Sequence, residues 1–334
     1  MATIRQVATL AGVSIGTVSK VLNGRDEKVD PAAKERILAS IRTLRYRPPA
    51  FEQNQKATIS ENVGMVVPDL TERPLQRHGY VYGLLDGVLE TSALRGWSVT
   101  IFADQMWSDV GTAVRRKYDG RCDTLIVVAP QPHRDLVRSL HERGAPIVQV
   151  GTTAWLDDVS SVDIDNHEVG RTVARHFLDL GHRRLGYLVD GREQMSSVER
   201  YAGFREVGGD TVQRLCIERD ETHEQFAHRL AGMGDQRPTA LMGWHDGVLV
   251  RCIPAFLKVG LEVPRDLSLV GVDNCGESEV FGFGLTSMLN PLDVIGRRAA
   301  AMAIDRVLDP TLPREIVKLT SSLHLGVTTA PWKG

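Results

Sequence analysis

The feature that most constrains this fold is an alternation, from residue 62 onward, of short apolar runs and longer amphipathic segments. The apolar runs are rich in Val, Ile and Leu and cover residues 62–68, 97–103, 123–130, 145–151, 183–190, 238–244 and 267–273. The amphipathic segments include 77–95, 133–143, 166–180 and 245–259. Continuous apolar runs are typical of strands buried on both faces, and β–α alternation predicts parallel sheets covered by helices.

This region is longer than one such sheet usually needs, so we expect two α/β lobes. Ligands of open parallel sheets bind at the carboxyl ends of the strands. The expected ligand site is therefore a cleft between the two lobes.

The first 46 residues have a different pattern, which predicts three short helices over 4–11, 15–22 and 31–44. Thr3 and Ser14 are suitable N-caps for the first two helices, and Asp30-Pro31 is a suitable start for the third. Gly12-Val13 predicts a tight turn, and Asn23-Gly24 is a good end for the second helix. Tyr46-Arg47-Pro48-Pro49 ends the third helix.

Charge divides the chain in the same way. Residues 1–60 hold ten Lys and Arg against five Asp and Glu, a net charge of +5, and the remainder carries −7. A basic head on an acidic body suggests a nucleic-acid partner for the head, although a solvated basic surface has the same composition.

The composition argues against a membrane or secreted protein. No apolar run approaches the ~20 residues that span a bilayer, and the N-terminus does not read as a signal peptide. The four cysteines (Cys122, Cys216, Cys252 and Cys275) form no C-x-x-C pair, so we expect reduced thiols and a cytoplasmic location.

One motif suggests an enzyme. Gly12-Val13-Ser14-Ile15-Gly16 fits G-x-S-x-G, the nucleophile elbow of many hydrolases. An elbow needs a strand before the serine, yet the apolar spacing of residues 4–13 is helical. His167-Glu168 and the pair His223 and His228 lack the spacing of zinc ligands. No nucleotide-binding glycine motif follows a strand, so we expect no cofactor, no metal and no enzymatic activity.

A helix-turn-helix explains the same residues better. Val18, Val21 and Leu22 supply an apolar face toward the other helices. The first turns and outer face of the second helix carry Ile15, Gly16, Thr17, Ser19 and Lys20. Such a helix presents its N-terminal residues to base edges in the major groove, and glycine allows a close backbone approach.

These residues resemble a known family. TIRQVATLAGVSIGTVSKVLN, followed by LRYRP, is similar to the N-terminal signature of the LacI/GalR family of bacterial repressors. Further similar motifs are VGMVVP, Asp165-Asn166 with LGHRRLGYL, RYAGF at 200–204, PTALMGWHD at 238–246, LSLVGVDN at 267–274 and LTSMLNP at 285–291. The motifs occur in the family's order along essentially the whole chain.

The resemblance implies an α/β protein with an all-α helix-turn-helix headpiece and a two-lobed core of parallel sheets, like a periplasmic binding protein. We expect the headpiece at 1–47, a hinge linker at 48–61 and the core at 62–334. Lobe 1 would cover about 62–162 and 291–319, and lobe 2 about 163–290 and 320–334. The partners implied are a palindromic DNA operator, a sugar-like effector in the cleft and a second copy of the chain.

The resemblance also implies site residues. Ile15, Gly16 and Lys20 match base-reading positions, and the matches to DNA-backbone positions are Thr3, Ser14, Thr17, Ser19, Asn23 and Tyr46. The matches to effector-contacting positions are Asp69, Arg73, Arg200, His245, Asp246 and Asp273. His245 replaces the usual Asn, and it can also donate or accept a hydrogen bond. Trp155, Trp244 and Phe281 are candidates to stack on a sugar, or else belong to the core.

The sequence departs from the family pattern at the hinge. The Leu that two subunits wedge into the minor groove is Gln55 here, and Phe51 is the large apolar residue nearby. The segment after Gly203 is short, which suggests a truncated helix. The C-terminus lacks leucine heptads, which favours a homodimer. Segment 77–95, with Val81, Leu84, Leu85, Val88 and Leu89, is a candidate for its interface or for ordinary packing on a sheet.

We therefore expect an effector-controlled transcriptional regulator, most simply a repressor, whose DNA affinity changes when the effector closes the cleft. The alternative is a sugar-binding protein whose DNA-binding function has degenerated.

Overall fold

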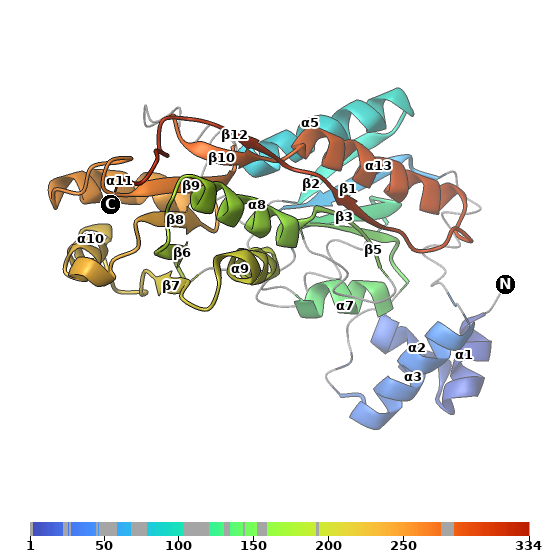
Figure 1. Cartoon of the computed structure of the whole chain (residues 1–334). Coiled ribbons are helices and arrows are strands. Elements are labelled where there is room, and N and C mark those ends of the chain that lie inside the picture. Colours follow the sequence, from blue (N-terminus) through green and yellow to red (C-terminus); the bar gives the residue numbers. More distant parts are fainter. Residues whose placement is uncertain are drawn as a thin grey trace. The chain divides into compact units, whose positions relative to one another are not determined.

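The computed structural model describes residues 3–22, 26, 28–44, 46, 59–67, 79–102, 120–129, 134–142, 144–151, 159–191, 194–274 and 284–333. The chain divides into two compact units (Figure 1). The first unit comprises Met1–Pro74, Leu84–Val162 and Asp293–Ile316, and the second comprises Leu75–Gly83, Asp163–Leu292 and Val317–Gly334. The chain thus changes from one unit to the other near residues 75, 84, 163, 293 and 317.

The N-terminal segment is a three-helix bundle of α1 (Ile4–Ala11), α2 (Ile15–Leu22) and α3 (Pro31–Leu44), at the bounds that the sequence predicts. Thr3 caps α1 in a reciprocal capping box with Gln6. Gly12 ends α1 in the left-handed conformation, with φ 66°, which glycine adopts without steric cost. The bundle core consists of Val7, Ala8, Ala11, Val18, Val21, Leu22, Ile37, Leu38, Ile41 and Tyr46.

The first unit also holds a six-stranded sheet in the order β11-β5-β4-β3-β1-β2. Its strands are β1 (Asn62–Val66), β2 (Ser98–Phe102), β3 (Thr124–Val128), β4 (Ile147–Val150), β5 (Ser160–Ile164) and β11 (Ile316–Leu319). The pairs from β2 through β1, β3 and β4 to β5 are parallel. The accompanying helices are α5 (Gly79–Leu94), α7 (Arg134–Glu142) and α13 (Leu292–Leu308).

The second unit holds a six-stranded sheet in the order β12-β10-β9-β8-β6-β7. Its strands are β6 (Leu185–Val189), β7 (Gln213–Cys216), β8 (Ala240–Gly243), β9 (Ser268–Asp273), β10 (Thr286–Leu289) and β12 (Ser322–His324). All neighbours are parallel except β10 and β12. The helices are α8 (Asn166–Asp179), α9 (Met195–Gly208), α10 (His223–Ala231) and α11 (Asp246–Lys258), with a 3-10 turn η2 (Gly234–Gln236).

Paired glycines bring two helices together in each unit. A Cβ on Gly170 of α8 would lie 2.0 Å from the Arg200 carbonyl oxygen, and one on Gly203 of α9 would lie 1.9 Å from that of His167. In the first unit, Gly87 of α5 and Gly296 of α13 make the same kind of backbone contact, and Figure 1 shows these helices side by side. Gly203 of the RYAGF motif is therefore a packing residue.

All seven apolar runs are strands, and the four amphipathic segments contain α5, α7, α8 and α11. The prediction missed β5, β7, β10, β11 and β12 and the helices α9, α10 and α13. β7, with the sequence QRLC, is a short edge strand that is only partly buried, so it lacks a continuous apolar run. The short segment after Gly203 suggested a truncated helix. The helix there, α9, has 14 residues and ends at Gly208, shortly before β7 begins.

For segment 77–95, the structure supports the alternative of ordinary packing for four of the five named residues. Val81, Leu84, Leu85 and Val88 are buried within the chain, as packing of the helix on its own unit requires. Leu89 is 46% exposed and is the one of the five named residues that stays on the surface.

Two further observations bear on the expected class of protein. Among the residues described, none of the helices has the length and apolar character to cross a membrane. Cys122, Cys216 and Cys252 form no disulfide, and Cys275 lies outside the described residues. Burial raises the pKa of the Cys252 thiol to about 12, so this cysteine stays protonated and unreactive.

Candidate functional site

The outer surface of α2 carries most of the predicted DNA-contacting residues. Thr3, Ser14, Gly16 and Lys20 are exposed, Ile15 is 44% exposed, and Thr17 and Ser19 are partly buried. Val18, which the sequence assigns to the core, is fully buried. Ile15 lies beside polar groups that suit a phosphate backbone.

Ser14 is a helix cap. Its Oγ accepts a hydrogen bond from the Thr17 N–H at 3.1 Å and lies 2.8 Å from the Thr17 hydroxyl. The residues before Ser14 form the helix α1 and a turn, where a nucleophile elbow requires a strand. The glycine pattern around Ser14 therefore belongs to a helix-turn-helix.

Tyr46 differs from the other DNA candidates and corrects a prediction. Its side chain is 2% exposed and packs in the core of the three-helix bundle. A side chain buried there cannot reach a phosphate unless it leaves the core, so Tyr46 stabilises the bundle. Asn23, Phe51 and Gln55 lie outside the described residues.

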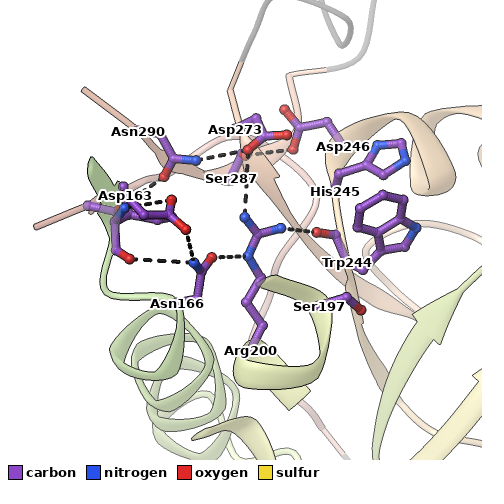
Figure 2. Close-up of polar contacts among 12 residues, drawn as sticks. Asp163, Asn166, Ser197, Arg200, Trp244, His245, Asp246, Asp273, Ser287 and Asn290 are labelled. Atoms are coloured by element: carbon purple, nitrogen blue, oxygen red, sulfur yellow. Dashed lines mark hydrogen bonds and ion pairs between the residues drawn. The ribbon is translucent and has the colours of Figure 1, made fainter. Parts of the chain in front are cut away.

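A second cluster of polar side chains lies in the other unit, at the carboxyl ends of its parallel strands. Asp190 follows β6, Trp244 and His245 follow β8, Asp273 ends β9, and Asn290 follows β10. Parallel pairing brings these strand ends to one edge of the sheet, where open α/β sheets bind ligands. Figure 2 shows most of these side chains around Arg200.

Arg200 of α9 is the centre of this cluster and is only 5% exposed. Its Nε donates to Asn166 Oδ1 at 2.8 Å, its Nη1 donates to the Trp244 carbonyl oxygen, and its Nη2 lies 4.0 Å from Asp273 Oδ1 (Figure 2). A buried guanidinium needs such partners, because desolvating an unpaired charge is costly. The three contacts fix the plane of the guanidinium.

Asp273 and Asn290 continue the network. Asn290 Nδ2 donates to Asp273 Oδ1 at 2.8 Å, and Ser321 Oγ donates to Asn290 Oδ1 at 2.7 Å. Asp273 has φ 101°, in a region that residues with a side chain rarely adopt. Strain of this kind collects at functional sites, where the surrounding contacts maintain it.

Asp246 begins α11 and is 2% exposed. Its Oδ1 accepts a hydrogen bond from Ser287 Oγ at 2.6 Å. A Cβ on Gly271 would lie 2.1 Å from the same oxygen, so only glycine at this point of β9 leaves room for the carboxylate. Gly271 thus determines where Asp246 sits.

Trp244 and His245 form an aromatic pair with ring centroids 4.2 Å apart and planes at 85°. The Trp244 indole N–H donates to Asp190 Oδ1 at 3.1 Å, and Arg251 pairs with the other oxygen of Asp190. His245 Nδ1 accepts from the Gly247 N–H at 2.8 Å, which caps α11. That bond requires an unprotonated Nδ1, so the neutral ring carries its proton on Nε2.

The structure brings together four of the six predicted effector residues: Arg200, His245, Asp246 and Asp273. The other two, Asp69 and Arg73, lie outside the described residues, as do Trp155 and Phe281. The sequence reasoning missed Asp163, Asp190, Ser287 and Asn290 as parts of the site. Asp190 and Asn290 directly follow strands, and that position could have identified them.

The histidine of the LGHRR motif has a structural role. His182 is buried, its Nδ1 lies 2.9 Å from Thr239 Oγ1, and its Nε2 lies 3.0 Å from Ser268 Oγ and 3.2 Å from the Ala330 carbonyl oxygen. Burial lowers the pKa of this imidazole. The motif therefore joins the starts of β8 and β9 to the C-terminal residues of the second unit, apart from the polar cluster.

Two family descriptions match this chain. The description "Bacterial regulatory proteins, lacI family" matches residues 3–49, which contain the helix-turn-helix. The description "Periplasmic binding protein-like domain" matches residues 174–329, which contain most of the second unit.

Curated relatives match over nearly the full length. The HTH-type transcriptional regulator CelR of Thermobifida fusca is 28% identical over 339 residues, covering 97% of each chain. The HTH-type transcriptional repressor PurR of Photobacterium profundum is 28% identical over 340 residues, with the same coverage.

Solved structures share the fold. The transcriptional regulator CelR–cellobiose complex aligns with a TM-score of 0.70 and 24% identity, covering 98% of this chain and all of the other. The lac repressor dimer bound to operator and the anti-inducer ONPF aligns with a TM-score of 0.68 and 21% identity, covering 98% and 99%.

A helix-turn-helix headpiece joined to a periplasmic-binding-protein-like core defines a class of bacterial DNA-binding regulators. This chain combines a segment that matches the lacI family of bacterial regulatory proteins with one that matches a periplasmic binding protein-like domain, and its full-length relatives are transcriptional regulators.

Proposed function

We propose that this protein represses transcription in the cytoplasm as a homodimer on a palindromic operator, and that a small polyhydroxylated effector changes its affinity for that operator. The effector is a sugar or a related metabolite, which the protein binds without transforming. The observation that carries the proposal is the Arg200 cluster, in which a fixed guanidinium and the carboxylates of Asp246 and Asp273 occur at the ligand-binding edge of a parallel sheet.

The chemistry of this cluster suits hydroxyl groups. Carboxylates accept hydrogen bonds from hydroxyls and a guanidinium donates to them, and charge assistance makes both bonds strong. Asp190, Asp246 and Asp273 outnumber the cations Arg200 and Arg251, which favours a neutral ligand over an anion such as a sugar phosphate. The CelR structure contains cellobiose, which is a neutral sugar.

For the headpiece, we propose that Ile15, Gly16 and Lys20 read bases, while Thr3, Ser14, Thr17, Ser19 and Asn23 hold the DNA backbone. The support is the exposure of Thr3, Ser14, Ile15, Gly16 and Lys20 on and around α2, and the capped, well-packed bundle beneath them. The lac repressor structure is a dimer on its operator. The domain divisions at 1–47, 48–61 and 62–334 belong to the same proposal.

DNA binding is tested by fluorescence anisotropy with fragments from the region upstream of the protein's own gene. We expect one fragment to bind, with an affinity that falls steeply with salt, because phosphate contacts release counterions. If no fragment binds even at low salt, the alternative of a sugar-binding protein with a degenerate headpiece replaces the regulator function for this chain.

Effector binding is tested by thermal shift with a panel of neutral sugars, cellobiose and ribose first, and their phosphorylated forms. We expect a neutral sugar to raise the melting temperature of the wild type and not of Arg200→Gln. Arg205→Gln is the matched control, because Arg205 lies on the same helix but pairs with Asp210 at the surface. A response to phosphorylated sugars only would contradict the proposed ligand class.

A further inference from the structure

A buried carboxyl that the family resemblance did not identify lies behind the Arg200 cluster. Asp163 is the penultimate residue of the strand β5 and is 4% exposed. Its Oδ1 accepts from the Ile164 N–H at 2.8 Å, and its Oδ2 accepts from Asn166 Nδ2 at 2.9 Å (Figure 2). Burying a carboxyl is costly, so its retention here calls for a role.

The Asn166 side-chain amide connects this carboxyl to Arg200, because it hydrogen-bonds to both side chains. Its amide is fully buried and lies between an obligate donor, the Arg200 Nε–H, and the Asp163 carboxylate. Only one orientation satisfies both neighbours: Oδ1 toward Arg200 and Nδ2 toward Asp163. If the amide flipped, its N–H would face the N–H of Arg200.

Protonation of Asp163 would disturb this arrangement. A carboxylate offers acceptors to both N–H groups, whereas a carboxylic acid carries a donor on one oxygen and is a weaker acceptor there. Its proton then competes with the Ile164 N–H or with the Asn166 amide. With the proton on Oδ2, the Asn166 amide loses the partner that fixes it; with the proton on Oδ1, Oδ2 becomes a neutral and weaker acceptor for that amide. The hydrogen bond between Asn166 and Arg200 weakens in either case.

We propose that Asp163 is a positioning residue for the effector site: through the Asn166 amide it holds the Arg200 guanidinium, and uptake of a proton by Asp163 loosens that hold and weakens effector binding. This inference rests on the proposed function for its effect on a ligand, but the relay itself is a property of the protein without ligand. Asp163 does not contact the ligand in this proposal.

The charges around Asp163 place the effect near neutral pH. Burial is the main cause that raises the pKa of Asp163, to about 7, and the Glu199 carboxylate raises it further. The Ile164 N–H, the Arg200 guanidinium and the Asn166 amide oppose that rise. Asp273 of β9 also faces Arg200, so the positive charge of Arg200 interacts with both carboxyl groups, Asp163 and Asp273. We therefore expect Asp163 to take up its proton near neutral pH.

The relay is tested first without ligand. In protein labelled with 15N-arginine, the Nε–H signal of Arg200, assigned by its absence in Arg200→Lys, should shift with a single midpoint near pH 7. Asp163→Asn should abolish this titration. Glu199→Gln is the matched control: it removes a like charge but no hydrogen bond of the relay, so the titration should persist with a lower midpoint.

The effect on binding is tested by calorimetry with the sugar that stabilises the protein in the thermal-shift panel, cellobiose being the first. Below the midpoint, the wild-type dissociation constant should rise by up to about tenfold per pH unit, whereas that of Asp163→Asn should stay flat. If Asp163→Asn folds poorly, Asn166→Ser interrupts the same relay, and the Arg200 signal should lose most of its pH response.

The outcomes separate the two proposals. An Arg200 signal that does not titrate, or that titrates unchanged in Asp163→Asn, overturns the relay, as does sugar binding with the same pH profile in both proteins. An intact relay in a protein that binds no sugar leaves the positioning role standing and contradicts the proposed effector.

Discussion

Ser14 accepts a hydrogen bond from the Thr17 N–H, and a serine hydroxyl can also donate to a phosphate oxygen. The cap and the proposed DNA contact are separable by substitution. Ser14→Ala should cost the headpiece about 1 kcal/mol and weaken DNA binding equally for all sequences. Ser14→Asp keeps a capping oxygen but adds a negative charge, so stability should be retained while affinity falls by tenfold or more.

Thermal unfolding and anisotropy with a set of operator variants measure these effects. Ile15→Ala and Lys20→Ala serve for comparison, because we expect these two changes to alter which sequence is preferred. A Ser14→Asp variant that binds DNA as the wild type does would contradict the phosphate contact.

Asp163 also predicts a pH-dependent stability. The pKa of its carboxyl is raised from 3.8 to about 7 in the folded chain. Between these values the folded state binds the proton more tightly than the unfolded state, so this residue lowers stability as pH rises from about 4 to 7 and has no further effect above. The Asp163→Asn variant has no carboxyl at this position, so it does not lose stability in this way as the pH rises.

The expected result is that the stability of Asp163→Asn relative to the wild type increases between pH 5 and pH 8. Urea unfolding at several pH values measures the difference, in which all other titrating groups cancel. A difference that does not change with pH would show that Asp163 stays ionised throughout this range.

Helix pairs in each unit depend on glycines at their crossing points. Because a Cβ on Gly203 would lie 1.9 Å from a backbone oxygen, no rotamer change can relieve the clash, and α8 and α9 must separate. Gly203→Ala should therefore lower the free energy of unfolding by about 1–3 kcal/mol or more. It should also reduce effector binding, since Asn166 on α8 and Arg200 on α9 would move apart.

Gly284→Ala is the control for this prediction, because its Cβ would have ordinary contacts, the nearest at 3.6 Å from Val327. Chemical denaturation and the thermal shift with sugar compare the two variants. Equal stabilities would mean that the crossing can adjust without cost.

Coupling between the effector and the operator is a property of the whole molecule. If the effector changes the affinity for DNA by some factor, DNA must change the affinity for the effector by the same factor. We expect a factor of about 5 to 150, typical of coupling energies of 1–3 kcal/mol. The direction of the change distinguishes an inducer from a corepressor.

The measurement is a pair of titrations: DNA affinity with and without saturating sugar, and sugar affinity with and without saturating operator. Arg200→Gln should remove the coupling while leaving the affinity of the sugar-free protein for DNA unchanged. If both ligands bind and neither affects the other, effector control of DNA binding is excluded.

Local sequence determined the elements of this protein. The helices α1, α2 and α3 have the bounds that caps and apolar spacing predict, because capping hydrogen bonds and helical periodicity involve residues a few positions apart. The strands β1, β2, β3, β4, β6, β8 and β9 were predictable because they are apolar on both faces. The edge strands β7, β11 and β12, the interior strands β5 and β10 with their polar residues, and the helices α9, α10 and α13 were not.

Tertiary structure decided how residues distant in sequence meet. Asn166 and Arg200 are 34 positions apart and meet because Gly170 and Gly203 let their helices touch. Asp163 looks like any polar residue in the sequence, and only its burial and its bond to Asn166 connect it with the site. Tyr46 and the apolar residues of α5 likewise became core residues through packing, which no local pattern specifies.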